Sequence, residues 1–178
     1  DYNIFGQLLN ADGTLFGGEF SISTAPSNQW YPSSAYDPVN QRFLVAWEDT
    51  RSGSSDIYGQ LISTTGSLIG GNFTISTAPN GQRWPSVAYD SVNQRFLVAW
   101  GDFRSGTNYD IYGQLISATG SLIGGNFPIS TASSGQYYPS MAYDSVNQRF
   151  LVAWADYRSG TNFDIYGQLI SSSGSLIG

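Results

Sequence analysis

The chain has 178 residues, and its 7 Lys+Arg against 13 Asp+Glu give a net charge of -6. Only 11% of residues are charged, which excludes a chain held open by charge repulsion, and the cations, all Arg, form no basic stripe for nucleic acid or an anionic membrane. The absence of Cys and His removes disulfides, thiol nucleophiles, a Ser-His-Asp triad and the commonest zinc ligands, so we expect no cofactor and no metal.

A repeat organises the chain from end to end. The string D-I-Y-G-Q-L starts at Asp56, Asp110 and Asp164, and a variant starts at Asn3, so the starts lie 53, 54 and 54 residues apart. Between 57–100 and 111–154, 37 of 44 positions are identical. Copies this similar must share one structure, and no apolar run in them approaches the ~20 residues of a membrane-spanning helix.

The sequence of each repeat unit predicts four short strands separated by turn residues. In one unit these strands cover 86–90, 95–100, 110–117 and 121–130. The continuous apolar run in the second strand indicates burial on both faces. Gly113 inside the third strand indicates close approach of a neighbouring group, and Gly124-Gly125 predicts a bulge in the fourth.

Four antiparallel strands per unit of this length predict an all-β protein, a β-propeller built from four-stranded antiparallel blades. A single sheet of this kind has two apolar faces, so neighbouring copies must stack against it. A β-solenoid or a row of separate sandwiches is the alternative. In chain order, the single repeat array 1–178 divides into a partial blade holding the last two strands (1–24) and three blades (30–77, 83–131 and 137–178), the last with a short fourth strand.

The unequal numbers of each strand do not close a ring, and three blades are fewer than the roughly four to eight of known propellers. We therefore expect the chain to be part of a longer array or to complete its ring with other copies as a homo-oligomer. Its unpaired strand edges should be adhesive.

A polar motif recurs at the end of each second strand. It comprises Trp47, Asp49, Arg51 and Asp56, then Trp100, Asp102, Arg104 and Asp110, then Trp154, Asp156, Arg158 and Asp164. We expect a structural motif in which Arg51 forks between Asp49 and Asp56 and fixes the following loop. The alternatives are an anion or sugar site, or calcium held by Asp49 and Asp56, although this loop has fewer carboxylates than an EF-hand.

The spacing W-x-D-x-R-S-G followed by D-I-Y-G-Q resembles the propeller-type repeats of large secreted or surface proteins of bacteria. The resemblance covers essentially the whole chain. It implies a propeller fold and an extracellular or cell-surface location, and it says little about activity.

The loops that precede each first strand differ most between copies. Four of the seven differences between the last two copies lie there, at positions 79, 80, 83 and 84. Aromatic rings beside amide groups suit sugars, so we expect these loops to bind carbohydrate or a surface polymer. The candidate residues are Gln29, Trp30, Tyr31, Gln82, Arg83, Trp84, Gln136, Tyr137 and Tyr138. The alternative is that Tyr31, Trp84 and Tyr138 pack between blades.

An enzyme would need residues that break the repeat, and the ionisable ones are Asp12, Glu19, Glu48 and Arg83. Glu48 and Asp49 could supply the two carboxyls of glycoside hydrolysis, but adjacent residues on a strand point apart. Near-identical copies without an inserted site therefore predict a non-enzymatic extracellular binding module with no catalytic residues. The alternatives are a structural protein that assembles into rings or filaments and a glycosidase-like propeller.

Overall fold

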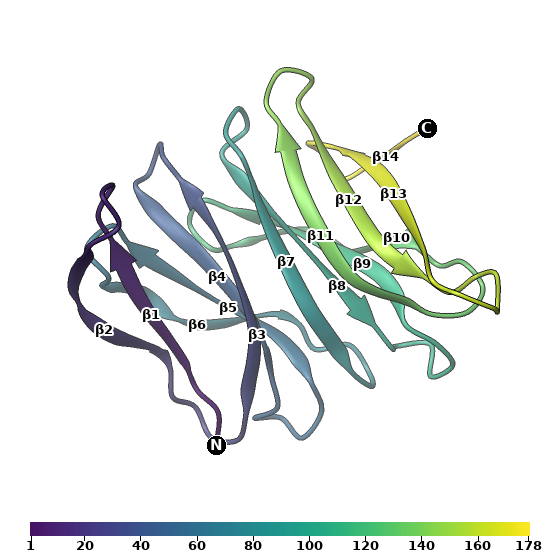
Figure 1. The fold of residues 1–178 in the computed structure, drawn as a ribbon, viewed down its shortest axis with the longest axis horizontal. Helices are drawn as coiled ribbons and strands as arrows, with labels where there is room; N and C mark the ends of the chain where they lie inside the picture. The colour runs from purple at the N-terminus through teal and green to yellow at the C-terminus, as the bar shows by residue number, and fades with distance from the viewer.

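The computed structural model describes residues 1–178 as strands joined by short turns (Figure 1). The chain contains no long apolar helix of the kind that crosses a membrane. In chain order the strands are β1 (Ile4–Leu9), β2 (Leu15–Ser23), β3 (Gln29–Asp37), β4 (Arg42–Asp49), β5 (Asp56–Ser63), β6 (Leu68–Ser76), β7 (Gln82–Asp90), β8 (Arg95–Asp102), β9 (Asp110–Ser117), β10 (Leu122–Ser130), β11 (Gln136–Asp144), β12 (Arg149–Asp156), β13 (Asp164–Ser171) and β14 (Leu176–Ile177).

The strands form three four-stranded antiparallel sheets, β3 to β6, β7 to β10 and β11 to β14, each in sequential order, and β1 pairs with β2 alone. Figure 1 shows the sheets side by side, and the first strand of the middle sheet, β7, contacts the first strands of its neighbours, β3 and β11. These sheets are propeller blades, which confirms the predicted fold class. The alternatives, a β-solenoid or a row of separate sandwiches, are both wrong, because each repeat forms its own antiparallel sheet and neighbouring sheets share their cores.

Strand β8 shows how a blade buries both faces. Phe96, Val98 and Trp100 belong to a core cluster shared with β4 and β5, whereas Leu97 and Ala99 belong to a second cluster shared with β12. All five side chains are fully buried. The continuous apolar run in the sequence therefore reports two interfaces, one with the preceding blade and one with the following blade.

The first strand of each blade starts earlier than the sequence predicted. Strand β7 begins at Gln82 rather than at Ser86, and its pairing with β8 shifts register between Arg83 and Ser86. Trp84 lies inside this bulge with a φ of 55°, in the left-handed region that residues other than Gly rarely occupy. The bulge and the following Pro85 interrupt the alternation by which a strand is recognised in a sequence.

The two glycine predictions are confirmed. A Cβ at Gly113 would lie 3.0 Å from Ile129 Cδ1, because side chains of β10 cover this glycine. Gly124 has a φ of 68°, and the pairing of β10 with β9 shifts register between Ile123 and Phe127.

Candidate functional site

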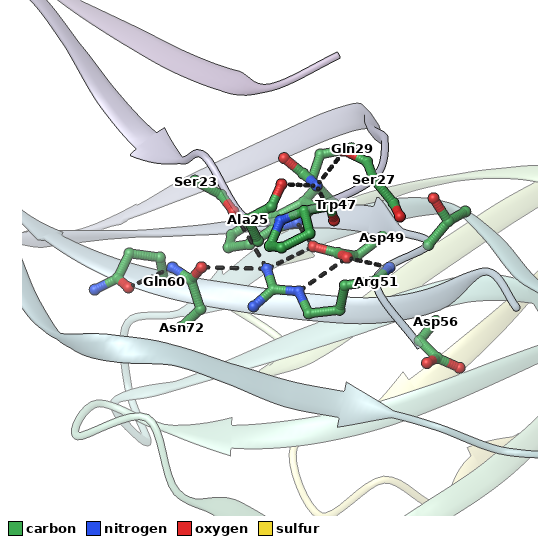
Figure 2. Close-up of polar contacts among 12 residues, drawn as sticks. Ser23, Ala25, Ser27, Gln29, Trp47, Asp49, Arg51, Asp56, Gln60 and Asn72 are labelled. Atoms are coloured by element: carbon green, nitrogen blue, oxygen red, sulfur yellow. Dashed lines mark hydrogen bonds and ion pairs between the residues drawn. The ribbon is translucent and has the colours of Figure 1, made fainter. Parts of the chain in front are cut away.

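The recurring Trp-Asp-Arg motif closes on itself at the end of β4 (Figure 2). Asp49 is fully buried and accepts hydrogen bonds from Trp47 Nε1 at 2.8 Å, Arg51 Nε at 2.9 Å and Arg51 Nη2 at 2.6 Å. The guanidinium also stacks on Tyr58, with Cζ 4.2 Å from the ring centroid. This bidentate pair fixes the loop that leads into β5.

The same motif links neighbouring blades. Arg51 Nη2 also donates to Ser23 Oγ of the preceding blade and to Asn72 Oδ1, each at 3.2 Å. Asp102 with Arg104 and Asp156 with Arg158 repeat the bidentate geometry in the next two blades. A motif that holds the same indole, carboxylate and guanidinium together in every blade stabilises the array.

The expected fork of Arg51 between two carboxylates is not formed. Asp56 points away from Arg51 in Figure 2 and accepts a hydrogen bond from Ser52 Oγ. Burial raises the pKa of Asp56, and the nearby charge of Asp49 adds to the shift. No cluster of three or more acidic side chains that could hold a metal ion occurs in the chain.

The three glutamines predicted to contact a ligand lie inside the protein. Gln29 Nε2 donates to the carbonyls of Ala25 and Ser27, both at 3.0 Å, and thereby closes the loop that precedes β3 (Figure 2). Gln82 Nε2 donates to the carbonyl of Ala78 and Gln136 Nε2 to that of Ala132 in the same way, and all three side chains are buried. Their role is to shape the loop that presents the aromatic residues.

The bulge at the start of each first strand carries one aromatic residue, which is exposed at Tyr31 and Tyr138 and half-buried at Trp84. Tyr31, Trp84 and Tyr138 have φ values of 51°, 55° and 54°, and each is followed by proline. Tyr31 is 56% exposed and Tyr138 is 61% exposed. Trp30 pairs with a single aromatic ring, that of Tyr2, and the two ring centroids lie 6.2 Å apart.

Seven rings from the second and third complete blades form one connected group, in which Phe103 contacts Tyr109 and Tyr157 contacts Phe163. We call the other five rings of the group the aromatic surface: Trp84, Tyr109, Tyr137, Tyr138 and Phe163. The centroid of Trp84 lies 4.6 Å from Tyr138, 5.0 Å from Tyr109 and 5.8 Å from Tyr137. Tyr137 in turn lies 5.7 Å from Phe163, which is 60% exposed. The structure therefore brings Trp84, Tyr137 and Tyr138 together and leaves Trp30 and Tyr31 outside this group.

The sequence prediction missed Tyr109 and Phe163. Both lie in the loop after the Trp-Asp-Arg motif, which reads D-F-R-S-G-T-N-Y-D in one copy and D-Y-R-S-G-T-N-F-D in the next. The first copy reads D-T-R-S-G-S-S-D, one residue shorter and without aromatics. This difference in length and composition is the signal that could have identified them.

Glu48 is a buried acid beside the aromatic surface. It is 1% exposed and occupies a position that is Gly101 and Ala155 in the other blades. Glu48 Oε1 accepts a hydrogen bond from Ser55 Oγ at 2.8 Å and lies 3.7 Å from Arg83 Nε, whereas Oε2 has no partner. Burial raises the pKa of Glu48, although Ser55 and Arg83 oppose the shift.

Arg83 lies beside Glu48, and the charges of both residues act on Tyr109, which belongs to the aromatic surface. Burial raises the pKa of Tyr109, whose hydroxyl also responds to the charges of Arg83 and Glu48. Asp49 plays no part, because its carboxylate is held by Trp47 and Arg51. The two adjacent carboxyls therefore serve different purposes, as expected for successive residues on a strand.

The raised pKa of Glu48 predicts how stability changes with pH. A carboxyl whose pKa is higher in the folded state contributes stability below its unfolded pKa, and this contribution is lost as the pH rises through the folded pKa. Replacing Glu48 with Gln removes this loss and keeps an acceptor for Ser55. We expect Glu48→Gln to increase Tm more at pH 7 than at pH 4, measured by circular dichroism; an equal change at both pH values would contradict the raised pKa.

Comparison with known proteins gives a fold and no family. No protein-family model matches the chain, and no curated protein matches its sequence. Among solved structures, a thermostable family-43 glycoside hydrolase has a TM-score of 0.59 at 14% identity, over 97% of this chain and 69% of its own. The GH43 endo-arabinanase from Bacillus licheniformis has a TM-score of 0.55 at 17% identity, over 97% and 71%.

A third similar structure is an N-acetylgalactosamine deacetylase from F. plautii, with a TM-score of 0.57 at 10% identity over 86% of this chain. This chain spans about half of that protein's length, since the match covers 53% of it. The protein is thus a β-propeller array with the fold of these carbohydrate-active enzymes.

These structures contradict the expectation that the chain is not an enzyme. That expectation rested on near-identical blades that lack an inserted site. The expectation is wrong because proteins of the same fold are glycoside hydrolases and a deacetylase. Within this chain, single substitutions such as Glu48 and Arg83 already give one blade boundary a chemistry that the others lack.

Proposed function

We propose that this chain is part of a glycosidase-like, carbohydrate-active propeller whose aromatic surface binds a glycan beside Glu48. The observation that carries the proposal is the position of a buried carboxyl with a raised pKa next to five connected rings. Aromatic rings pack on the C–H faces of sugars, while a neighbouring acid and a guanidinium can address ring oxygens and hydroxyls. The similar hydrolases support the same class of ligand.

Glu48 is the candidate proton donor. Glycoside hydrolysis uses one carboxylic acid with a raised pKa to protonate the leaving oxygen and a second carboxyl about 5 to 9.5 Å away. Glu48 has the properties of the first of these groups, and Arg83, whose side chain is 45% exposed, covers it. The chain corresponds to 69% and 71% of two hydrolases, and the proposal assigns this chain the glycan surface and the acid.

Glycan binding is tested by titrating the protein with arabinan oligosaccharides and a panel of other plant and bacterial glycans, using calorimetry. We expect saturable binding, and a loss of about 1 to 2 kcal/mol of binding free energy, roughly tenfold or more in Kd, when Trp84 is replaced with Ala. Tyr31→Ala is the matched control, because Tyr31 occupies the same bulge and lies outside the aromatic surface. Absence of binding to every glycan would refute the proposal.

The role of Glu48 is tested separately by release of reducing ends from the glycan that binds. We expect Glu48→Gln to abolish any hydrolysis while leaving Kd within about threefold, because the amide keeps the size of the side chain and loses the proton. Equal hydrolysis by the wild type and Glu48→Gln would remove Glu48 from the proposal. An extracellular or cell-surface location, supported by the resemblance to the repeats of secreted or surface proteins, belongs to the same proposal.

A further inference from the structure

Six of the seven arginines recur once in each complete blade, in two sets that each keep one place in the repeat. They are Arg51, Arg104 and Arg158 of the Trp-Asp-Arg motif, and Arg42, Arg95 and Arg149 at the first position of the second strands. Arg83 is the seventh. The equivalent position is Trp30 in the preceding blade and Tyr137 in the following blade, so Arg83 meets no packing requirement that the blades share.

The guanidinium of Arg83 has one charged neighbour and no hydrogen bond within the chain. Its shortest distance to a carboxylate joins Nε to Glu48 Oε1, at 3.7 Å, beyond the length of a hydrogen bond. Arg104, in contrast, binds Asp102 through Nε and Nη2 at 2.9 and 2.7 Å. Because the side chain of Arg83 is 45% exposed, its two Nη groups, which form the fork that binds carboxylates, remain available to a ligand.

Glu48 offsets only part of this charge. Glu48 is buried, and burial disfavours its ionised form and raises its pKa, although Ser55 and Arg83 oppose the shift. Since Nε is the guanidinium nitrogen closest to Glu48, the Nη edge of the guanidinium lies farther from this acid. A ligand carboxylate that binds Nη1 and Nη2 therefore approaches the edge of the guanidinium that does not face Glu48.

Arg83 lies against the aromatic surface. A Cβ at Gly81 would lie 3.7 Å from Tyr109 Oη and 3.9 Å from Arg83 Nε, so these two groups flank the same glycine. Gly101, the register partner of Arg83, has no side chain, and a Cβ there would lie 3.0 Å from Trp84 Cε3. The small size of both glycines thus brings the cation next to the rings of Trp84 and Tyr109.

We propose that the glycan bound at the aromatic surface carries a carboxylate, as a uronic acid residue does, and that Arg83 binds this carboxylate through its two Nη groups. This step rests on the proposed function and narrows its ligand to acidic glycans. The planar guanidinium matches a carboxylate with two parallel hydrogen bonds, while neighbouring sugar rings stack on Trp84 and Tyr138. A neutral sugar would leave the charge of Arg83 without this partner.

The overall charge of the chain opposes such a preference. The net charge of -6 repels an acidic glycan. At physiological ionic strength, however, exposed charges more than about 8 Å apart are largely screened, whereas a guanidinium in contact with a carboxylate is not. A preference for an acidic glycan therefore has to come from a local cation, and Arg83 is the cation beside the aromatic surface that no carboxylate of the chain binds directly.

The test compares tetragalacturonate with its methyl ester by calorimetry at one ionic strength. Esterification removes the charges and keeps the sugar rings and their hydroxyl groups. We expect the acid to bind about tenfold more tightly than the ester, which is the effect of one bidentate pair with a charged partner. Arg83→Gln should abolish this preference, and Arg83→Lys should retain only part of it, because an ammonium keeps the charge and lacks the planar fork.

Arg149→Gln is the matched control for net charge. Arg149 lies 3.6 Å from Asp144 in a partly exposed pair, at the last residue of β11, whereas Arg83 is the second residue of β7. Its removal changes the net charge equally and should leave the preference for the acid intact.

Three results would overturn the assignment of Arg83 while leaving glycan binding in place. They are equal Kd values for the acid and the ester with the wild type, a preference that survives Arg83→Gln, and a preference that Arg149→Gln abolishes as well. If tetragalacturonate, its ester and an arabinan oligosaccharide all failed to bind, the proposed function itself would be contradicted.

Discussion

Replacing Asp102 with Ala is expected to lower the free energy of unfolding by about 3 kcal/mol, because it removes the acceptor shared by a buried indole and a guanidinium. Asp102 is fully buried and accepts from Trp100 Nε1 at 2.7 Å and from Arg104 Nε and Nη2 at 2.9 and 2.7 Å. Without it, Trp100 keeps an unpaired donor in the core, and Arg104, whose side chain is 25% exposed, keeps an uncompensated charge.

Urea denaturation measures the effect of Asp102→Ala, and Asp12→Ala serves as its control. Asp12 is exposed and bonds only within a turn, to Thr14. Its removal should leave the free energy of unfolding nearly unchanged. If the two variants lost similar stability, the Trp-Asp-Arg motif would not be the structural element assigned to it.

Leu97→Ala is expected to cost about 2 to 5 kcal/mol, as large-to-small changes in a packed core do. Leu97 is fully buried in the cluster between the second and third complete blades. Leu151 occupies the same place in the same local sequence, R-F-L-V-A-W, but is 46% exposed because no other blade of these 178 residues packs on it.

Leu151→Ala should therefore cost less than about 1 kcal/mol. Thermal or urea unfolding of both variants under one set of conditions makes the comparison. Equal losses at positions 97 and 151 would show that burial by the neighbouring blade is not what stabilises these strands.

Blade architecture could be predicted because local and global signals agree. The side chains of residues 96–100 alternate between the two faces of the sheet. Because all of them are apolar, the sequence predicts that both faces are covered. The bulge at Gly124 and the close contact at Gly113 follow from the freedom and small size of glycine. The start of β7 could not be predicted, since Trp84 adopts a backbone conformation that its residue type disfavours.

The candidate site depends on contacts between blades, which a single sequence does not reveal. Glu48 stands out as an acid that breaks the repeat, but its burial comes from the packed array and its partner Arg83 comes from the next blade. Leu97 and Leu151 lie in identical local sequences but differ in burial, so the sequence alone does not predict how much each contributes to stability. Trp84, in the bulge of β7, likewise packs on Tyr138 of the next blade, a contact that the sequence alone does not show.

The most direct test of the proposed site is an NMR titration of the five indole Nε1–H resonances with an arabinan oligosaccharide. Trp47, Trp100 and Trp154 are buried and bonded to Asp49, Asp102 and Asp156, so their resonances should not move. Trp84 lies in the aromatic surface, and we predict that its resonance alone shifts with saturation. Movement of Trp30 without Trp84, or of no indole with any glycan of the panel, would contradict the account.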